Sequence, residues 1–159
     1  MLTQRSQLAR SYKAAGANAV DEHGNLDLAE FINVSKDDAL AYPRVAHRRY
    51  PPPTEARMES TIKPFVQRSI YVNDVLLGAL GGKLGLPPNA LGDRHKIDEL
   101  SGSETRCIKN PPRPAGMSES RSVVGAHTDF GSLVSSPFWV HINCSCNCNT
   151  PFYTIVFLT

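Results

Sequence analysis

Apolar residues recur at intervals of three and four between residues 58 and 80, and this pattern restricts the fold more than any other feature of the chain. Such spacing predicts a helix with one apolar face, because positions three and four apart lie on the same side of an α-helix. Pro64 lies inside the pattern and is expected to kink the helix or divide it in two. Gly85, followed by Pro87, is a stop signal. The apolar positions are Met58, Ile62, Phe65, Val72, Leu76 and Leu80.

Strand-like segments follow the helical region. Residues 105–109 and 122–129 are expected to form strands, and a shorter helix is expected over 88–94. Upstream, residues 8–15 are expected to form a short helix and residues 26–32 a short amphipathic element. Residues 35–38 are expected to form a loop or the start of a helix. Residues 50–53 are expected to be extended, because each proline disfavours helix in the residue before it. Helices first and strands afterwards predict an α+β fold or a helix-backed β-fold.

Composition excludes several classes of protein. The net charge is +2, with 20% charged and 41% hydrophobic residues, so the basic character of a nucleic-acid binder is missing. No run is long enough for a transmembrane helix, and the polar start lacks the apolar core of a secretory signal. The first 20 residues contain no Asp or Glu, which leaves an organellar presequence as a minor alternative. Four cysteines without a signal peptide favour reduced thiols and a cytoplasmic location.

One histidine and one aspartate form the candidate metal site. His127 and Asp129 lie in the sequence Gly-Ala-His-Thr-Asp-Phe-Gly-Ser-Leu at 125–133. Side chains two apart in a strand share a face, so both groups can bind one cation. With a second histidine from a distant strand they would complete the two-His, one-carboxylate triad of non-haem Fe(II) oxygenases. The alternative for His127 is a strand histidine that is hydrogen-bonded to a neighbouring side chain.

The segment 125–133 resembles the metal-binding strand of the isopenicillin N synthase-like family of 2-oxoglutarate and Fe(II)-dependent dioxygenases, above all its fungal members. Three upstream segments match in register. Residues 55–66 and 83–87 resemble the long helix of the family and its exit, and 102–112 resembles the strand before the metal motif. The resemblance begins near Tyr12 and covers about the middle half of a typical member.

The resemblance implies a jelly-roll (double-stranded β-helix) core backed by helices. It also implies Fe(II) as the metal, 2-oxoglutarate and O₂ as co-substrates, and a small-molecule substrate that is hydroxylated, desaturated or cyclised. The resemblance does not imply a nucleic acid or a membrane as a binding partner. Carried over residue by residue, His127 and Asp129 are iron ligands. The resemblance assigns no catalytic or oxoglutarate-binding residue to this chain.

The sequence departs from the family in several respects. The distal histidine of the family and its Arg-x-Ser pair for the oxoglutarate carboxylate have no counterpart, and His141, the only later histidine, follows the motif too closely. Ile108 and Asn110 stand where plant relatives place Asn and Tyr. We therefore expect the chain as given to be an inactive, truncated member with an incomplete jelly roll. The alternative is a non-enzymatic fragment or interaction module that acts through Arg48 and Arg49 or through the apolar tail.

Residues 134–159 differ in composition from the rest. They contain no Lys, Arg, Asp or Glu, and at the ~25% charged frequency of globular domains such a run has odds on the order of one in a thousand. Val134 and Ser135 are what a translated splice-donor sequence would encode. The sequence therefore predicts three regions: an N-terminal helical region at 1–100, the start of the jelly roll at 101–133, and an aberrant tail at 134–159 from intron read-through.

The remaining metal-capable and cationic residues are expected to carry no chemistry. A Cys₃His zinc site from Cys144, Cys146, Cys148 and His141 is a rival interpretation of the tail, disfavoured because an extended Cys-x-Cys-x-Cys does not converge on one tetrahedral centre. Cys107 is expected to pack as a small apolar residue in a strand. For Arg48 and Arg49 a solvated loop is favoured over an acidic-partner site. His23, His47 and His95 are placed in polar loops or at helix ends.

Overall fold

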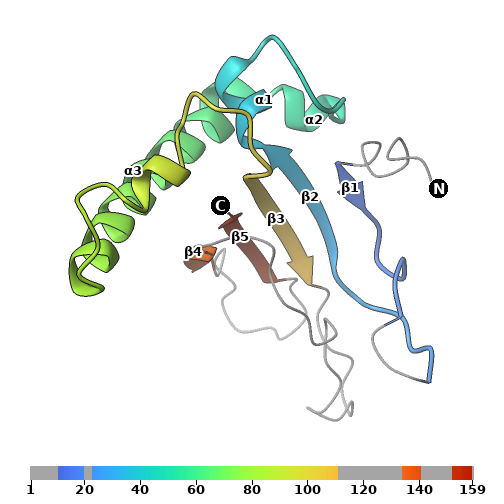
Figure 1. The fold of residues 1–159 in the computed structure, drawn as a ribbon. Helices are drawn as coiled ribbons and strands as arrows, with labels where there is room; N and C mark the ends of the chain where they lie inside the picture. The colour runs from blue at the N-terminus through green and yellow to red at the C-terminus, as the bar shows by residue number, and fades with distance from the viewer. Residues whose placement is uncertain (1–10, 20–22, 111–133, 141–151, 159) are drawn as a thin grey trace, which may run out of the picture.

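The computed structural model describes residues 11–19, 23–110, 134–140 and 152–158. Helices and strands are both present, so the mixed α and β class predicted from the sequence is confirmed. The predicted order of helices first and strands afterwards is wrong, because β1 and β2 precede the helices and β3 follows them. Figure 1 shows the helices gathered at one end of the sheet, where β2 ends and β3 begins. This end is where the packed core lies.

The sheet is antiparallel throughout. Its order is β1 (Tyr12–Lys13), β2 (Glu30–Ser35), β3 (Glu104–Asn110), β5 (Phe152–Leu158) and β4 (Val134–Val140). The strand predicted over 105–109 is therefore confirmed as β3, one residue longer at each end. The expected element at 26–32 is in fact β2 and begins four residues later. Residues 122–129, the other predicted strand, lie outside the described residues.

The two faces of β2 and β3 differ in character. Directly opposite residues of an antiparallel pair share a face, and the register pairs Val34 with Thr105 and Asn33 with Arg106. The Val34 face consists of Glu30, Ile32, Val34, Thr105, Cys107 and Lys109. The Arg106 face consists of Phe31, Asn33, Ser35, Glu104, Arg106 and Ile108. Only the Val34 face contributes to the helix-packed core.

The core is small and joins one end of the sheet to the helices. Its buried members are Val34, Ala39, Tyr50, Met58 and Val66, packed against partly buried Leu40, Tyr42, Ile62 and Ile70. These residues come from β2, from α1 (Lys36–Ala41), from the loop before α2 (Pro52–Glu55), and from the helical segments that follow. Burial of this cluster fixes the helices against the end of the sheet.

The long helix is divided as the proline predicted. A π-helical turn, η1 (Met58–Ile62), passes directly into α3 (Lys63–Lys83), and Pro64 occupies the first turn of α3. The first turn of a helix tolerates proline because its N–H groups lack intrahelical acceptors. The change of helix type at this point is the division expected from Pro64.

The predicted apolar face is wrong in the second half of the helix. Met58 is fully buried, but Val72, Leu76 and Leu80 are 48%, 43% and 42% exposed. The buried positions of α3 are instead Val66, Ser69, Asn73 and Leu77. The physical reason is the π-helical turn, whose i→i+5 bonds place more residues in a turn than an α-helix does. The face toward the core therefore falls later in the sequence than a uniform α-helical period predicts.

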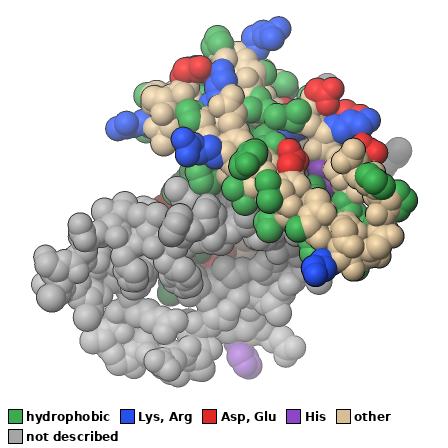
Figure 2. All heavy atoms as spheres, turned by 90° about the vertical axis from the view of Figure 1, so that its left-hand side faces the viewer, with side chains coloured by type: hydrophobic (Ala, Val, Ile, Leu, Met, Phe, Trp, Pro, Cys, Tyr) green, Lys and Arg blue, Asp and Glu red, His purple; other side chains and the backbone are tan. Residues whose placement is uncertain are grey.

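The outer side of α3 consequently exposes several large apolar side chains. Tyr71 is 70% exposed and Val75 is 55% exposed, whereas polar Ser69 and Asn73 are buried. Figure 2, which views this side of the molecule, shows hydrophobic side chains on the surface between charged ones. An apolar helix exterior of this kind is unusual for an isolated surface helix.

The end of α3 follows the predicted stop signal. Gly85 adopts a left-handed φ of 67°. Its N–H bonds to the Gly82 carbonyl at 3.2 Å, and the Leu86 N–H bonds to the Gly81 carbonyl at 3.0 Å. This is the Schellman arrangement, which needs positive φ at the residue after the C-cap.

Three shorter predictions are wrong or limited. Residues 88–94 form turns and a single 3-10 turn, η2 (Gly92–Arg94), instead of a helix, because Asn89 adopts a left-handed φ of 62° that interrupts a right-handed helix. Tyr12–Lys13 pairs with β2 as β1, so the helix expected at 8–15 does not form over its described part. The extended segment predicted over 50–53 ends at Pro51, because Pro52 begins α2, where the fixed φ of proline suits the first helical position. The helix start predicted at 35–38 is confirmed.

Two parts of residues 134–159 lie in the sheet. β5 pairs with β3 along its whole length, from Glu104 opposite Leu158 to Asn110 opposite Phe152, and β4 pairs with β5. The sequence analysis predicted no strand in this region. Its apolar, charge-free composition is compatible with a strand that has a neighbour on both edges.

Candidate functional site

The predicted metal ligands belong to a segment that follows β3 and precedes β4 in the sequence. His127 and Asp129 fall within 111–133, after β3 and before β4, and are outside the described residues. The described part of the chain therefore fixes only where the segment leaves and re-enters the sheet. Cys144, Cys146, Cys148 and His141, the rival zinc ligands, also lie outside the described residues.

Among residues 11–19 and 23–110, no group of three or more His, Cys, Asp or Glu side chains is arranged to hold a metal ion. The chemistry of this part of the chain is instead that of four polar clusters on and beside the sheet. The first lies within residues 35–50, and the other three join segments that are far apart in the sequence.

The first cluster is centred on Asp38, which is fully buried in α1. Its Oδ1 accepts hydrogen bonds from the backbone N–H groups of Ala46 at 2.7 Å and His47 at 2.9 Å. Its Oδ2 accepts from Arg48 N–H at 3.2 Å and from the Tyr50 hydroxyl at 2.6 Å. One carboxylate thus satisfies four donors and fixes the course of the chain from residue 46 to residue 50.

Tyr50 extends this cluster to β2. The Ser35 N–H donates to the Tyr50 hydroxyl at 3.1 Å, while the same hydroxyl donates to Asp38. Burial, together with the neighbouring Asp38 carboxylate, raises the pKa of Tyr50 well above its usual value. The phenol therefore remains protonated and able to donate.

The second cluster joins α1 to the loop before β3. Lys36, almost fully buried, donates from Nζ to the Ile97 carbonyl at 3.1 Å and the Glu99 carbonyl at 2.7 Å, and it contacts Asp37 Oδ1 at 3.1 Å. Asp37 Oδ2 accepts from Ser101 N–H at 3.1 Å. A buried ammonium needs such a set of acceptors, because desolvating it without partners is costly.

Asp37 also meets an imidazole. His47 Nε2 lies 3.0 Å from Asp37 Oδ2. Burial alone would raise the pKa of Asp37, but hydrogen bonds from Ser101 N–H, Lys36 and His47 outweigh it and lower that pKa. The arrangement is a charged connection between α1 and two loops, and the Ser101 hydroxyl beside it donates a hydrogen bond to Ser103 Oγ at 3.1 Å.

The third cluster lies on the Arg106 face. Glu104 stands between two guanidinium groups: Arg48 Nη2 is 3.3 Å from its Oε2, and Arg106 Nη2 is 2.9 Å from its Oε1. Arg106 Nε also donates to Asn33 Oδ1 at 2.8 Å. Arg48, Glu104 and Arg106 are called the Arg–Glu–Arg triad below.

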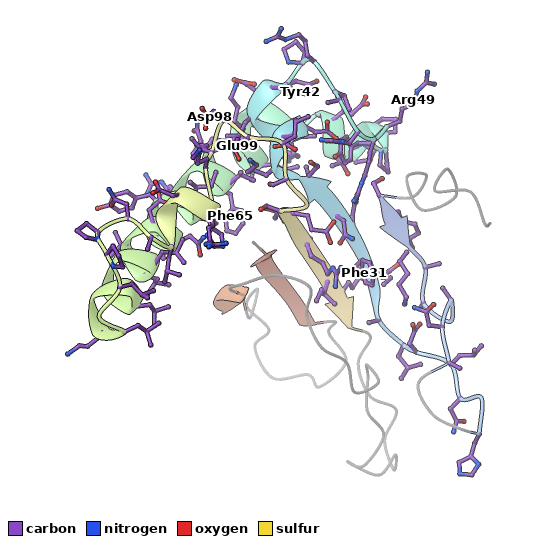
Figure 3. The ribbon with its side chains drawn as sticks, viewed as in Figure 1. Phe31, Tyr42, Arg49, Phe65, Asp98 and Glu99 are labelled. Carbon is purple, nitrogen blue, oxygen red and sulfur yellow. The ribbon has the colours of Figure 1, made fainter. Side chains whose placement is uncertain are left out.

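Phe31 lies beside the triad on the same face. The Arg106 guanidinium carbon is 4.5 Å from the centre of the Phe31 ring, and Lys13 Nζ is 5.2 Å from it. Figure 3 shows Phe31 on the sheet, whereas Arg49 points away from it. A guanidinium held by stacking and two hydrogen bonds loses little freedom when it binds a further group.

The opposite face carries a triad across three strands. The Tyr12 hydroxyl donates to Glu30 Oε2 at 2.6 Å, and Lys109 Nζ bonds to Glu30 Oε1. The hydrogen bond from Lys109, followed by that from Tyr12, lowers the pKa of Glu30, and the same Glu30 raises the pKa of Tyr12. Pairs of this kind stabilise the register of the strands.

Two β3 side chains face the core side. Thr105 is buried and its Oγ1 has no hydrogen-bond partner in the structure as described. Burial raises the pKa of the Cys107 thiol, which keeps it protonated and unreactive. The placement of Cys107 in a strand was predicted, and its side chain is partly buried.

The remaining histidines hold structural positions. His95 Nδ1 lies 2.9 Å from the Leu91 carbonyl beside η2, and His47 is part of the second cluster. His23 is exposed in a turn. The prediction for Arg48 and Arg49 holds in part, because Arg49 is exposed while Arg48 is held by Glu104.

The sequence analysis missed these clusters. The run Ser35–Asp38 was interpreted as a loop or helix start, and nothing in local spacing indicates that Asp38 would be fully buried. The one available signal was density of charge: Lys36, Asp37 and Asp38 stand together immediately after the apolar end of β2.

Comparisons with protein-family models, with curated proteins and with solved structures gave no match to this chain. Every helix within the described ranges is too short or too polar to span a lipid bilayer.

Proposed function

We propose that this chain is a member of the isopenicillin N synthase-like dioxygenase family and that His127 and Asp129 are ligands for Fe(II). The observation that carries the proposal is the segment 125–133, where an imidazole and a carboxylate stand two residues apart between bracketing glycines. Imidazole nitrogen and carboxylate oxygen are the donor set that non-haem Fe(II) sites use. Their spacing allows both to reach one ion from a single strand.

The arrangement of the sheet supports this proposal. β3 lies at the position that the resemblance assigns to the strand before the metal motif, and it is an internal strand with neighbours on both edges. An antiparallel sheet with helices at one end is compatible with the first part of a jelly roll. The finer architecture, an incomplete double-stranded β-helix at 101–133, belongs to the proposal.

In this family, bound Fe(II) with 2-oxoglutarate and O₂ supplies the oxidising power that hydroxylates, desaturates or cyclises a small molecule. The residues of this chain would contribute binding: His127 one neutral nitrogen and Asp129 one carboxylate oxygen. His127 must be deprotonated at its ligating nitrogen, so metal binding should weaken below about pH 6.5, the ordinary pKa of histidine. The proposal includes a cytoplasmic location, where the four cysteines would remain reduced.

Metal titration of the 159-residue chain tests the proposal. Mn²⁺ serves as an oxygen-stable probe for the Fe(II) site, and the loss of its free-ion EPR signal measures binding. His127→Ala and Asp129→Ala should each weaken Mn²⁺ binding by tenfold or more, because a metal site loses most of its affinity when one of its ligands is removed. His95→Ala is the matched control. Unchanged binding in the first two variants would refute the site.

The same chain also separates catalysis from binding. The printed sequence supplies two ligands of the family triad and no Arg-x-Ser pair after them, so we expect metal binding without release of succinate from 2-oxoglutarate. His141→Ala should have no effect on Mn²⁺ binding. If His141→Ala weakens binding while His127→Ala does not, the metal site lies in the tail. A chain that folds and binds no metal favours the alternative, an interaction module.

A further inference from the structure

The Arg–Glu–Arg triad is a built cationic site without an assigned role. Two guanidinium groups converge on one carboxylate, so the triad carries one net positive charge. Its members are partly accessible, with side-chain exposures of 24% for Arg48, 29% for Arg106 and 12% for Glu104. An exposed edge of a positioned guanidinium is a bidentate donor for carboxylate.

Apolar groups continue from the triad along the same face. Ile108 stands directly opposite Phe31 in the register, two residues beyond Arg106. The distance from Arg106 to Ile108 along the strand is about 7 Å at 3.4 Å per residue. The Arg106 face therefore offers a cationic end and an apolar end within the length of a small organic acid.

The surroundings favour a carboxylate over a free cation or a neutral ligand. Arg106 is already fixed by Asn33, Glu104 and Phe31, so little side-chain entropy remains to be lost on binding. Lys13 adds a further cation beside Phe31, although Asp27 is its ion-pair partner at 2.6 Å.

We propose that the Arg–Glu–Arg triad and the adjoining Phe31 and Ile108 form a binding site for a small molecule that carries a carboxylate on an apolar, preferably aromatic, body. The site lies on β3 and β2 and uses neither His127 nor Asp129. It therefore goes beyond the proposed iron site and can be tested in the metal-free chain.

NMR titration of the ¹⁵N-labelled wild-type chain is the first test. Benzoate should shift the Arg106 Nε–Hε signal and the β3 amides near Glu104, with saturation in the millimolar range or below. Benzamide has the same ring without the charge and should cause no comparable shift. Equal effects of the two compounds, or no effect of benzoate, would overturn the proposal. Tighter binding of inorganic phosphate than of benzoate would overturn the assignment to carboxylate.

Variants give the sign of the electrostatic effect. Arg106→Gln should weaken benzoate binding about tenfold, the loss expected for one hydrogen bond to a charged group. Glu104→Gln should strengthen it severalfold, because the competing carboxylate is removed. A triad with only a structural role would not produce tighter binding in Glu104→Gln. Arg68→Gln, on exposed α3, is the control and should leave benzoate binding unchanged; if it weakens binding equally, the attraction is non-specific and the proposal is wrong.

Discussion

Substitution of Asp38 by alanine should destabilise the fold more than any other single removal of a charge in the described part of the chain. The carboxylate is fully buried and accepts hydrogen bonds from three backbone N–H groups and the Tyr50 hydroxyl. Alanine would leave these donors buried without an acceptor, and each such donor costs about 1–3 kcal/mol. Partial entry of water reduces the sum, so we expect a loss of about 4 kcal/mol in the free energy of unfolding.

Urea denaturation followed by far-UV circular dichroism measures this loss. At about 2–4 °C per kcal/mol for a chain of this size, the melting temperature should fall by about 10 °C. Asp38→Asn retains one acceptor oxygen and should lose less. Asp74→Ala, an exposed position on α3, is the control and should change stability by under about 0.5 kcal/mol. If Asp38→Ala behaves like Asp74→Ala, the carboxylate does not fix residues 46–50 and the reasoning is wrong.

Three further predictions concern pH, packing and backbone conformation. The pKa of Asp37 is lowered in the folded chain. Its contribution to stability is therefore present above its ordinary pKa of about 4 and is lost as the pH falls through the folded value. Urea unfolding between pH 7 and 2 should show this loss of stability in the wild type and a smaller loss in Asp37→Asn. Met58→Ala should cost about 2–5 kcal/mol and the half-exposed Leu76→Ala under about 1 kcal/mol; equal costs would contradict the observed helix face. Gly85→Ala should lower the free energy of unfolding by about 1 kcal/mol because Gly85 has a positive φ. Gly82 lies inside α3, with open space around it among the described atoms, so Gly82→Ala should raise the free energy of unfolding by up to about 1 kcal/mol. Thermal melts of the two variants would show whether the melting temperature falls in the first and rises in the second.

The sequence predicted those elements that depend on local signals. Pro64 indicated the division of the long helix, Gly85 indicated its end, and residues 105–109 were predicted as the strand that became β3. These signals act through backbone conformation within a few residues, so they can be interpreted without knowledge of the tertiary structure.

The predictions that were wrong depended on tertiary structure. The π-helical turn before Lys63 shifts the buried face of α3, and no local pattern announces that shift. Tyr12 forms a strand only because β2 is beside it. The burial of Asp38 follows from the return of residues 46–50 over α1, a contact that helical periodicity does not encode.

The candidate sites show the same contrast. His127 and Asp129 could be proposed from the sequence because two ligands of one metal can lie two residues apart in a strand. The Arg–Glu–Arg triad was not found, because Arg48 and Glu104 are separated by 56 residues along the chain. A site of that kind becomes visible only when the sheet and the loop above it are assembled.

The position of β5 affects how the protein must be made in the cell. β5 lies between β3 and β4 in the sheet, yet the ribosome produces it after both of them. Until residues 152–158 have left the exit tunnel, β3 exposes a free edge of N–H and C=O groups. Nascent chains on neighbouring ribosomes can pair through that edge, so slow translation past residue 140 should favour insoluble product and chaperone capture should oppose it.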